Sequence, residues 1–172
     1  TRRSSSAASD VYKRQHTESP NGKLSFVILN EPPSMSPISI SKLNEESADF
    51  IMTESVILSA NDSPTAHIIE VGVDDPDGVS VVQAKMGRLA PIGSSEKWLS
   101  LNDVGENGDR IAGDGIYTIT FEARSSLGPG LIDIHIRALD IYQSMTPLSE
   151  QSHQLNICLL YKSDAADEDL RV

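Results

Sequence analysis

The chain has 172 residues, of which 38% are hydrophobic and 23% are charged, and its formal net charge at pH 7 is −11. A chain this acidic repels nucleic acid and anionic lipid, so neither is an expected partner. Its single cysteine, Cys158, excludes a disulfide framework and a thiolate metal site, and no apolar run approaches the length of a membrane-spanning helix.

The two ends of the chain are expected to lie outside the native module. Residues 5–15 and 158–167 can be read, with one residue different, as translations of opposite strands of one DNA sequence, and they resemble a translated sequencing adapter. We therefore set aside residues 1–15, which we expect to be disordered, and residues 158–172. The remaining piece of about 140 residues suffices for one domain with a real core.

The first predicted elements form a junction. Residues 23–29 read as a short strand, and Pro32 and Pro33 then stop it because proline lacks the N–H that a ladder requires. We interpret residues 16–33 as the last strand of a preceding domain followed by a stiff linker. The next domain is predicted over residues 34–157, with a first edge strand over 34–43 and an acidic, polar loop over 44–53.

From Glu54 the hydrophobic pattern settles into a period of two, which is typical of half-buried strands. In the clearest strand, over residues 131–139, Ile132, Ile134 and Ile136 share one face. Further strands are predicted over 54–60, 67–73, 79–86, 97–101 and 116–123, with a last one from Leu155. About seven short strands with Gly, Pro and Asp turns predict an all-β antiparallel sandwich with its core in residues 54–157, and a closed barrel is the alternative.

The loop between the strands at 97–101 and 116–123 is the one candidate metal site. Asp103, Asn107, Asp109 and Asp114 fall at positions 1, 5, 7 and 12 of a twelve-residue window, with Gly108 at position 6, as in an EF-hand loop. Flanking strands exclude an EF-hand proper. Two interpretations stay open: a Ca²⁺ site built on a β-loop, or a plain turn held by aspartate hydrogen bonds to the backbone.

Other polar clusters are weaker candidates. Residues 74–78, with sequence DDPDG, could hold a second cation, but a turn is the favoured interpretation because Pro and Gly suit its two central conformations. The histidines of the domain, His67, His135 and His153, match no nucleophile, zinc or phosphate motif. We therefore expect a protein that is not an enzyme.

Four motifs carry a resemblance to a known family, namely VDDPDG (73–78), LNDVGENGD (101–109), AGDGIYT (112–118) and IRALD (136–140). With them, the stretch from Val71 to Ile157 resembles the immunoglobulin-like repeat modules of large bacterial and archaeal surface or secreted proteins. The resemblance implies an immunoglobulin-like sandwich, tandem copies, an extracellular or cell-surface setting and a spacer or adhesive role. It also implies that Tyr117 begins strand F and forms a structural tyrosine corner.

Two functional hypotheses follow. The first is a non-catalytic stalk, spacer or adhesion module whose partners are neighbouring immunoglobulin-like domains of the same chain, with Ca²⁺ as a candidate stabiliser and a glycan or protein ligand left open. The alternative is a carbohydrate-binding accessory module of a secreted enzyme. That alternative requires exposed aromatic rings lying side by side, for which Trp98 and Tyr142 are the candidates.

Overall fold

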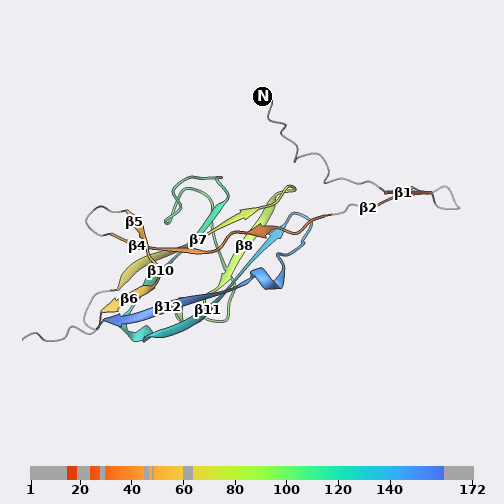
Figure 1. The fold of residues 1–172 in the computed structure, drawn as a ribbon. Coiled ribbons are helices and arrows are strands. Elements are labelled where there is room, and N and C mark those ends of the chain that lie inside the picture. The colour runs from red at the N-terminus through yellow and green to blue at the C-terminus, as the bar shows by residue number, and fades with distance from the viewer. Residues whose placement is uncertain are drawn as a thin grey trace, which may run out of the picture.

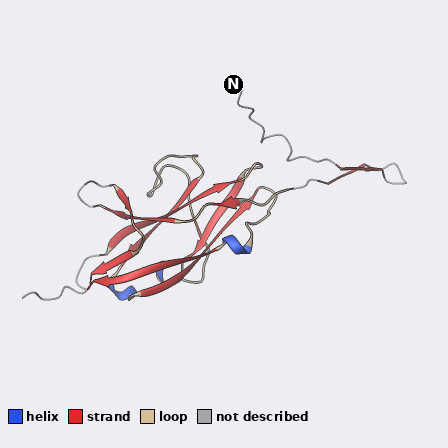
Figure 2. Ribbon diagram, in the orientation of Figure 1, coloured by secondary structure: helices blue, strands red, loops and turns tan. Residues whose placement is uncertain are grey.

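Two β-sheets face each other across one apolar interior (Figures 1 and 2). The computed structural model describes residues 15–18, 24–27, 30–44, 47, 49–59 and 64–160. Within these residues, helical structure is limited to the short 3₁₀ turns η1 (Gly87–Leu89), η2 (Ser125–Leu127) and η3 (Leu148–Glu150), and no helix is long and apolar enough to cross a membrane. The all-β sandwich prediction is confirmed, and the closed barrel is not formed.

The first sheet has the strand order β10-β7-β4-β5, and β3 pairs with the end of β7. All its pairings are antiparallel. Its strands are β3 (Ser34–Met35), β4 (Ser39–Leu43), β5 (Phe50–Met52), β7 (Thr65–Asp74) and β10 (Ile116–Ala123).

The second sheet has the order β6-β12-β11-β8-β9, in which β12 pairs with β6 in parallel and every other pairing is antiparallel. Its strands are β6 (Val56–Ser59), β8 (Val79–Lys85), β9 (Leu99–Ser100), β11 (Gly130–Asp140) and β12 (Ser152–Leu160). The chain passes from the first sheet into the second between β5 and β6, so one continuous segment contributes an outer strand to each sheet.

The sandwich has ten strands, two more than the eight ranges predicted from the sequence. The prediction of a loop over residues 44–53 is wrong toward its end, because Phe50–Met52 forms β5 and pairs with β4. The predicted strand over 34–43 is divided into β3 and β4, and Pro37, which has no N–H to give to a ladder, lies in the break. Sequence alternation is weak in strands this short, so they carry little signal.

The interior follows the alternation that the sequence predicts. Ile134 and Ile136 on β11 and Ala84 on β8 are completely buried, and Phe121 packs against them from β10's inner face as part of the same cluster. The other buried side chains of this core are Ile40, Val56, Leu58, Ile69, Val71, Val73, Val82, Met86, Leu89, Leu101, Ala123, Ile132, Ala138, Leu155 and Ile157. Each buried Val, Leu, Ile, Phe or Met side chain contributes on the order of 2 kcal/mol through removal of apolar surface from water, and each Ala contributes less.

Strand placement corrects the interpretation of Tyr117. The strand that contains it, β10, pairs with β7 in the first sheet, which is the place of strand E in an immunoglobulin-like sandwich. The place of strand F, between two neighbours in the other sheet, is taken by β11. A tyrosine corner belongs to strand F, so the tyrosine-corner interpretation of Tyr117 is wrong. The sequence could not show this, because a local motif does not specify which strand its own strand pairs with.

The segment before the sandwich contains β1 (Gln15–Glu18) and β2 (Leu24–Val27), labelled in Figure 1, which pair antiparallel as a separate two-stranded sheet. Most of the two adapter-like ends, residues 1–14 and 161–172, lies outside the described residues, so the disorder expected of residues 1–15 stays a prediction. Strand β12 continues past the predicted boundary at Ile157 to Leu160, and Leu159 packs against the core.

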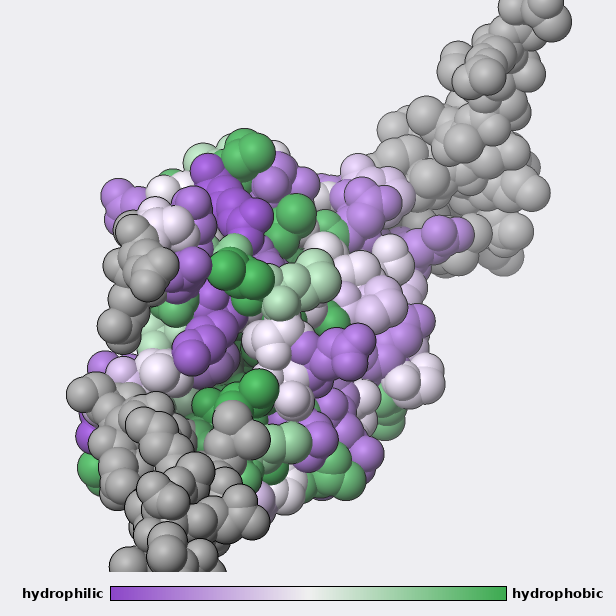
Figure 3. All heavy atoms as spheres, turned by 60° about the vertical axis from the view of Figure 1, so that its left-hand side comes forward, coloured by the Kyte–Doolittle hydropathy of each residue, from purple (hydrophilic) through white to green (hydrophobic). Residues whose placement is uncertain are grey.

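Exposed apolar side chains on the outer strands are dispersed. Ile51 and Met52 on β5 and Ile57 on β6 are 56%, 73% and 44% exposed. Figure 3, which turns the side of the molecule with these strands forward, shows hydrophobic residues interspersed with hydrophilic ones. Isolated exposed apolar residues are ordinary on a protein surface and define no site by themselves.

Candidate metal centre

The acidic loop, residues 102–115, folds back over the outer face of the first sheet. Its base is closed by reciprocal backbone hydrogen bonds between Asn102 and Thr118, of 3.0 and 2.8 Å. Its middle lies on Ile68, which points away from the interior yet is 0% exposed. Gly108 makes this approach possible, since its φ is 97° and an added Cβ would lie 2.6 Å from Cγ2 of Ile68.

This folding brings three of the four predicted site residues together. Oxygen atoms of Asp103, Asp109 and Asp114 all lie within 4.8 Å of one another. Asp109 is 7% exposed, Asp103 is half-buried and Asp114 is exposed. Asn107, the fourth, is exposed and adopts a φ of 55°, so its backbone serves the turn that leads into Gly108.

The carboxylates also act as ties within the loop. Asp103 accepts hydrogen bonds from the amides of Gly113 at 2.7 Å and Gly115 at 3.0 Å, and Asp109 accepts from Gly105 at 2.5 Å. Asp114 Oδ1 accepts from the amide of Ile116 at 2.9 Å. A carboxylate has about four acceptor positions, so these bonds leave capacity for a cation. The geometry thus fits Ca²⁺, and it equally satisfies the turn interpretation.

Two buried acceptors beneath the loop were missed by the sequence analysis. Oδ1 of Asn102 and Oγ1 of Thr118 have no hydrogen-bond partner among the described residues, and both atoms are buried. Asn102 directly precedes Asp103, which is the only sequence signal that could have included it. Thr118 lies on the outer face of β10, opposite the core side of the strand, yet it is only 1% exposed.

The charge of Asp103 reaches the neighbouring strand. Burial raises the pKa of Tyr117, and the negative charge of Asp103 raises it further because both oppose formation of a phenolate. Tyr117 is half-buried and packs against the core. Tyr117 therefore contributes to the core by packing, and its hydroxyl is kept protonated by burial and by the charge of Asp103.

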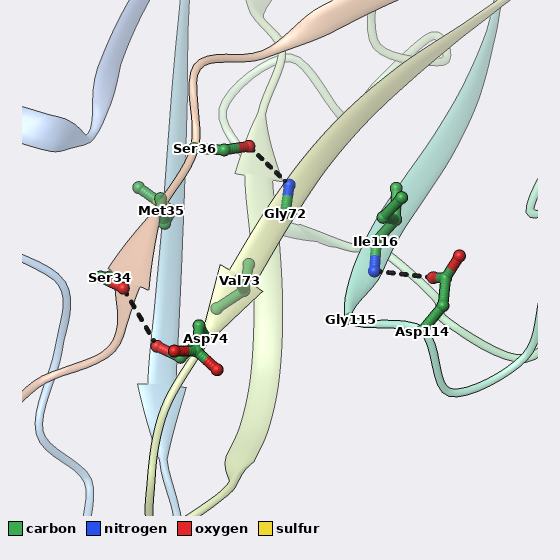
Figure 4. Close-up of a pocket in the computed structure, with 9 residues that line it drawn as sticks. All are labelled: Ser34, Met35, Ser36, Gly72, Val73, Asp74, Asp114, Gly115 and Ile116. Atoms are coloured by element: carbon green, nitrogen blue, oxygen red, sulfur yellow. Dashed lines mark hydrogen bonds between the residues drawn. The ribbon is translucent and has the colours of Figure 1, made fainter. Parts of the chain in front are cut away.

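An open groove of about 440 Å³ adjoins the loop (Figure 4). Residues 34–36 form one wall, residues 114–116 form the other, and residues 72–74 of β7 lie between them. At Gly72 the absence of a side chain lets Ser36 approach closely, since an added Cβ would lie 3.1 Å from Oγ of Ser36. That Oγ accepts a hydrogen bond from the Gly72 amide at 2.9 Å. The outermost carboxylate, Asp114, thus borders both the acidic cluster and this groove.

The DDPDG segment forms the turn that the sequence favoured. Oδ1 of Asp75 accepts the amides of Asp77 at 2.8 Å and Gly78 at 2.9 Å, and Gly78 takes a φ of 103°. The segment joins β7 to β8 at one end of the sandwich. Its aspartates work here as turn residues, as Asx turns generally do.

The histidines lie in separate environments. His67 is completely buried and stacks on Phe121, with ring centroids 5.3 Å apart. Burial lowers the pKa of His67, and the nearby charge of Lys42 lowers it further, although a hydrogen bond with the Thr65 backbone opposes the shift. His135 is exposed on β11, and burial lowers the pKa of the half-buried His153.

The aromatic pair that a carbohydrate site would require is not assembled. The guanidinium of Arg137 lies 4.0 Å from the centroid of the half-buried Trp98 ring and covers one of its faces. Tyr142, 47% exposed, lies in the turn after β11, where its amide donates to Asp140. The stacking surface of Trp98 is thus engaged by a side chain of the sandwich itself.

Comparisons with known proteins give distant structural likenesses. No family model matches the chain, and no curated protein matches it. Among solved structures, the chain is similar to a mutant of the SrpA adhesin from Streptococcus sanguinis, with 12% sequence identity and a TM-score of 0.36 over 74% of this chain. The chain spans 58% of that adhesin chain. A likeness at this level carries no argument about function.

Proposed function

We propose that the chain is a non-catalytic stalk or spacer module of a tandem-domain cell-surface or secreted protein. The observation that supports this proposal is the placement of the two chain ends. Asn30 lies beside Asp140, at the C-terminal end of β11, whereas β12 runs past the partner of Gly130 to Leu160 at the other end. The chain therefore enters and leaves at opposite poles (Figure 1), about 35 Å apart along β11.

Ends at opposite poles allow modules to follow one another in line, and they also set how a pulling force acts. Strand β12, which carries the outgoing chain, lies between β11 and β6 and pairs with both. A force along the chain acts along β12, roughly perpendicular to the ladder hydrogen bonds. These bonds are then loaded together rather than one after another, which suits a load-bearing spacer.

The partners in this proposal are the neighbouring immunoglobulin-like domains of the same chain, in an extracellular or cell-surface setting. A glycan or protein ligand for an adhesive role is left open. The strong acidity of the chain, −11 overall, keeps such an array soluble and makes divalent cations its natural counter-ions.

Calcium is part of the proposal as a stabiliser of the acidic loop. Asp103, Asp109 and Asp114 would supply carboxylate oxygens, and Asn107 is the candidate for a further oxygen ligand. A bound cation would offset the repulsion among three converging carboxylates. It would thereby stabilise the loop that covers Ile68.

Force spectroscopy on the single chain tests the spacer role. One pair of handles is attached at Asn30 and Leu160, and a matched pair is attached at Gly130 and Leu160, which lie at the same pole and peel β12 from β11. We expect a clearly higher unfolding force through the first pair. Equal forces through the two pairs would contradict a load-bearing role.

A further inference from the structure

Three segments of the chain meet at the end of the sandwich where the chain enters. We define the proximal pole as residues 30–35, the β7–β8 turn (74–78) and the segment after β11 (140–148). Figure 1 shows the end of β11, this turn and η3 on the side of the sandwich that leads to β2. The amide of Ile141 donates to the carbonyl of Gly78 at 3.2 Å, which ties the two loops together.

Asp140 is the centre of this pole. It is 0% exposed, and its Oδ1 accepts the amides of Tyr142 at 2.7 Å and Ser144 at 2.8 Å. The other carboxylate oxygen accepts a hydrogen bond from the side-chain amide of Asn30, which also donates to Oγ of Ser144 at 2.7 Å. Burial alone would raise the pKa of Asp140, but the hydrogen bonds from Asn30 and the backbone outweigh it and lower the pKa.

Asn30 therefore joins the incoming chain to a charge buried in the sandwich, across 110 residues of sequence. The attachment continues along the chain, since Pro33 is buried and β3 pairs with the end of β7. Strand β2 ends at Val27, so only two residues separate it from Asn30, and the three Cα–Cα steps between Val27 and Asn30 span at most about 11 Å. Whatever unit contains β2 is held within that distance of the proximal pole.

Exposed apolar side chains lie close together in the sequence next to this attachment. Ile141, Tyr142, Met145 and Leu148 are 55%, 47%, 40% and 82% exposed, within eight residues of each other. Exposed apolar side chains grouped in this way are typical of a surface that packs against another unit.

We infer that the proximal pole is a stiff joint that seats the unit preceding it in this same chain, the unit to which β1 and β2 belong. Asn30 fixes the linker, and the apolar residues 141–148 receive the preceding unit. Tether length selects this occupant over others, because a unit held about 11 Å away is present at a high effective concentration. The inference rests on the proposed function and adds that the module is rigidly oriented toward its N-terminal neighbour.

Nuclear magnetic resonance on the full chain tests this joint. Amide residual dipolar couplings and ¹⁵N relaxation are measured for β1 and β2 and for the sandwich strands. We expect both sets to share one alignment tensor and one rotational correlation time. Asn30→Ala, and separately Ile141→Ser with Leu148→Ser, are expected to uncouple the hairpin from the sandwich.

Controls separate the joint from general effects. Ile92→Ser changes an equally apolar residue that is fully exposed outside the pole, and it is expected to leave the coupling intact. Melting temperatures of all variants show that the sandwich remains folded. Independent tumbling of β1 and β2 in the unaltered chain, or coupling that survives both pole variants, overturns the inference.

Two further outcomes are informative. A correlation time that rises with protein concentration, and loses this rise in the Ile141→Ser, Leu148→Ser variant, would assign the surface to a second copy of the chain and overturn the inference. The force experiment pulls on the chain from Asn30 onward and measures the resistance of β12, so it involves neither β1 and β2 nor the apolar residues 141–148. A failure of the joint is therefore distinguishable from a failure of the spacer role.

Discussion

Neighbouring residues on the two faces of β7, Ile68 and Ile69, are buried to the same extent by different means. On the inner face, Ile69 and Val71 lie between the sheets among other aliphatic side chains. On the outer face, Ile68 is equally buried, but it is covered by a loop of glycines and hydrogen-bonded carboxylates. The comparison teaches that equal burial does not mean equal robustness, since the inner face depends on side-chain volume and the outer face on backbone conformation.

The largest expected effect comes from the inner face. Ile134→Ala removes most of a side chain that is 0% exposed at the centre of the core, and it is expected to destabilise the fold by about 2–5 kcal/mol. Denaturant unfolding measures this change. Ile92→Ala, at a fully exposed position, should have almost no effect, and a similar loss in both variants would contradict the assigned core.

The outer face is tested by Gly108→Ala, for which we expect a loss of about 3 kcal/mol. Left-handed backbone strain contributes about 1 kcal/mol, and overpacking against Ile68 contributes about 2 kcal/mol. Gly113→Ala is the matched control, since its φ is 75° but nothing lies near its added Cβ. The control should lose only the strain, and equal losses would show that the loop does not rest on Ile68.

Calcium should distinguish the two faces of β7, because Ca²⁺ is expected to stabilise only the acidic loop that covers Ile68 on the outer face. At about 2 mM Ca²⁺, a site with a dissociation constant of about 10⁻⁴–10⁻³ M stabilises the fold by about 1 kcal/mol. Asp109→Ala with Asp114→Ala is expected to abolish this increment in melting temperature between Ca²⁺ and chelator.

Asp133→Ala removes an exposed carboxylate of β11 outside the loop, and it should keep the calcium increment. Identical melting of the unaltered chain in Ca²⁺ and in chelator would refute the metal site. The acidic loop would then be a turn held by its own aspartates.

The smallest effect is a pH dependence from the inner face. Because burial lowers the pKa of His67 below its ordinary value of 6.5, folding favours the neutral ring. Stability from this residue is complete above pH 6.5 and declines as the pH falls below it. Melting at pH 7.5 and 5.5 should show a smaller decline in His67→Phe, which keeps an aromatic ring against Phe121.

His153, whose pKa burial also lowers, accounts for part of the remaining decline in both proteins. An unchanged pH dependence in His67→Phe would show that the ring of His67 is hydrated or protonated in the folded state.

Much of the interior could be predicted from the sequence, because alternation is a local property. Ile132, Ile134 and Ile136 lie two residues apart on one strand, and the pleat alone places them on one face. The burial of Ile68 could not be predicted in this way. It depends on Gly108, which lies 40 residues further along the chain and is brought to Ile68 by the tertiary fold alone.

In the candidate site, too, the features that one short loop determines could be predicted, whereas those that depend on distant contacts could not. The sequence indicated Asp103, Asp109 and Asp114 correctly as neighbours in space, since one short loop carries all three. It also offered a turn held by aspartate hydrogen bonds to the backbone, which these carboxylates form, but it did not show which amides they bind or that Thr118 is buried. The contact of Asn30 with Asp140 was beyond sequence reasoning, since nothing in either local pattern refers to the other.

The passage of the chain from β4 and β5 to β6 has a consequence for how the domain comes apart. One short length of polypeptide is a member of both sheets, paired with β7 through β4 in one and with β12 through β6 in the other. The two sheets are thus connected covalently at their edges. We expect both sheets of a module to unfold in a single all-or-none event. The force–extension curve of an array of such modules would then show regularly spaced force peaks of equal height, one for each module that unfolds.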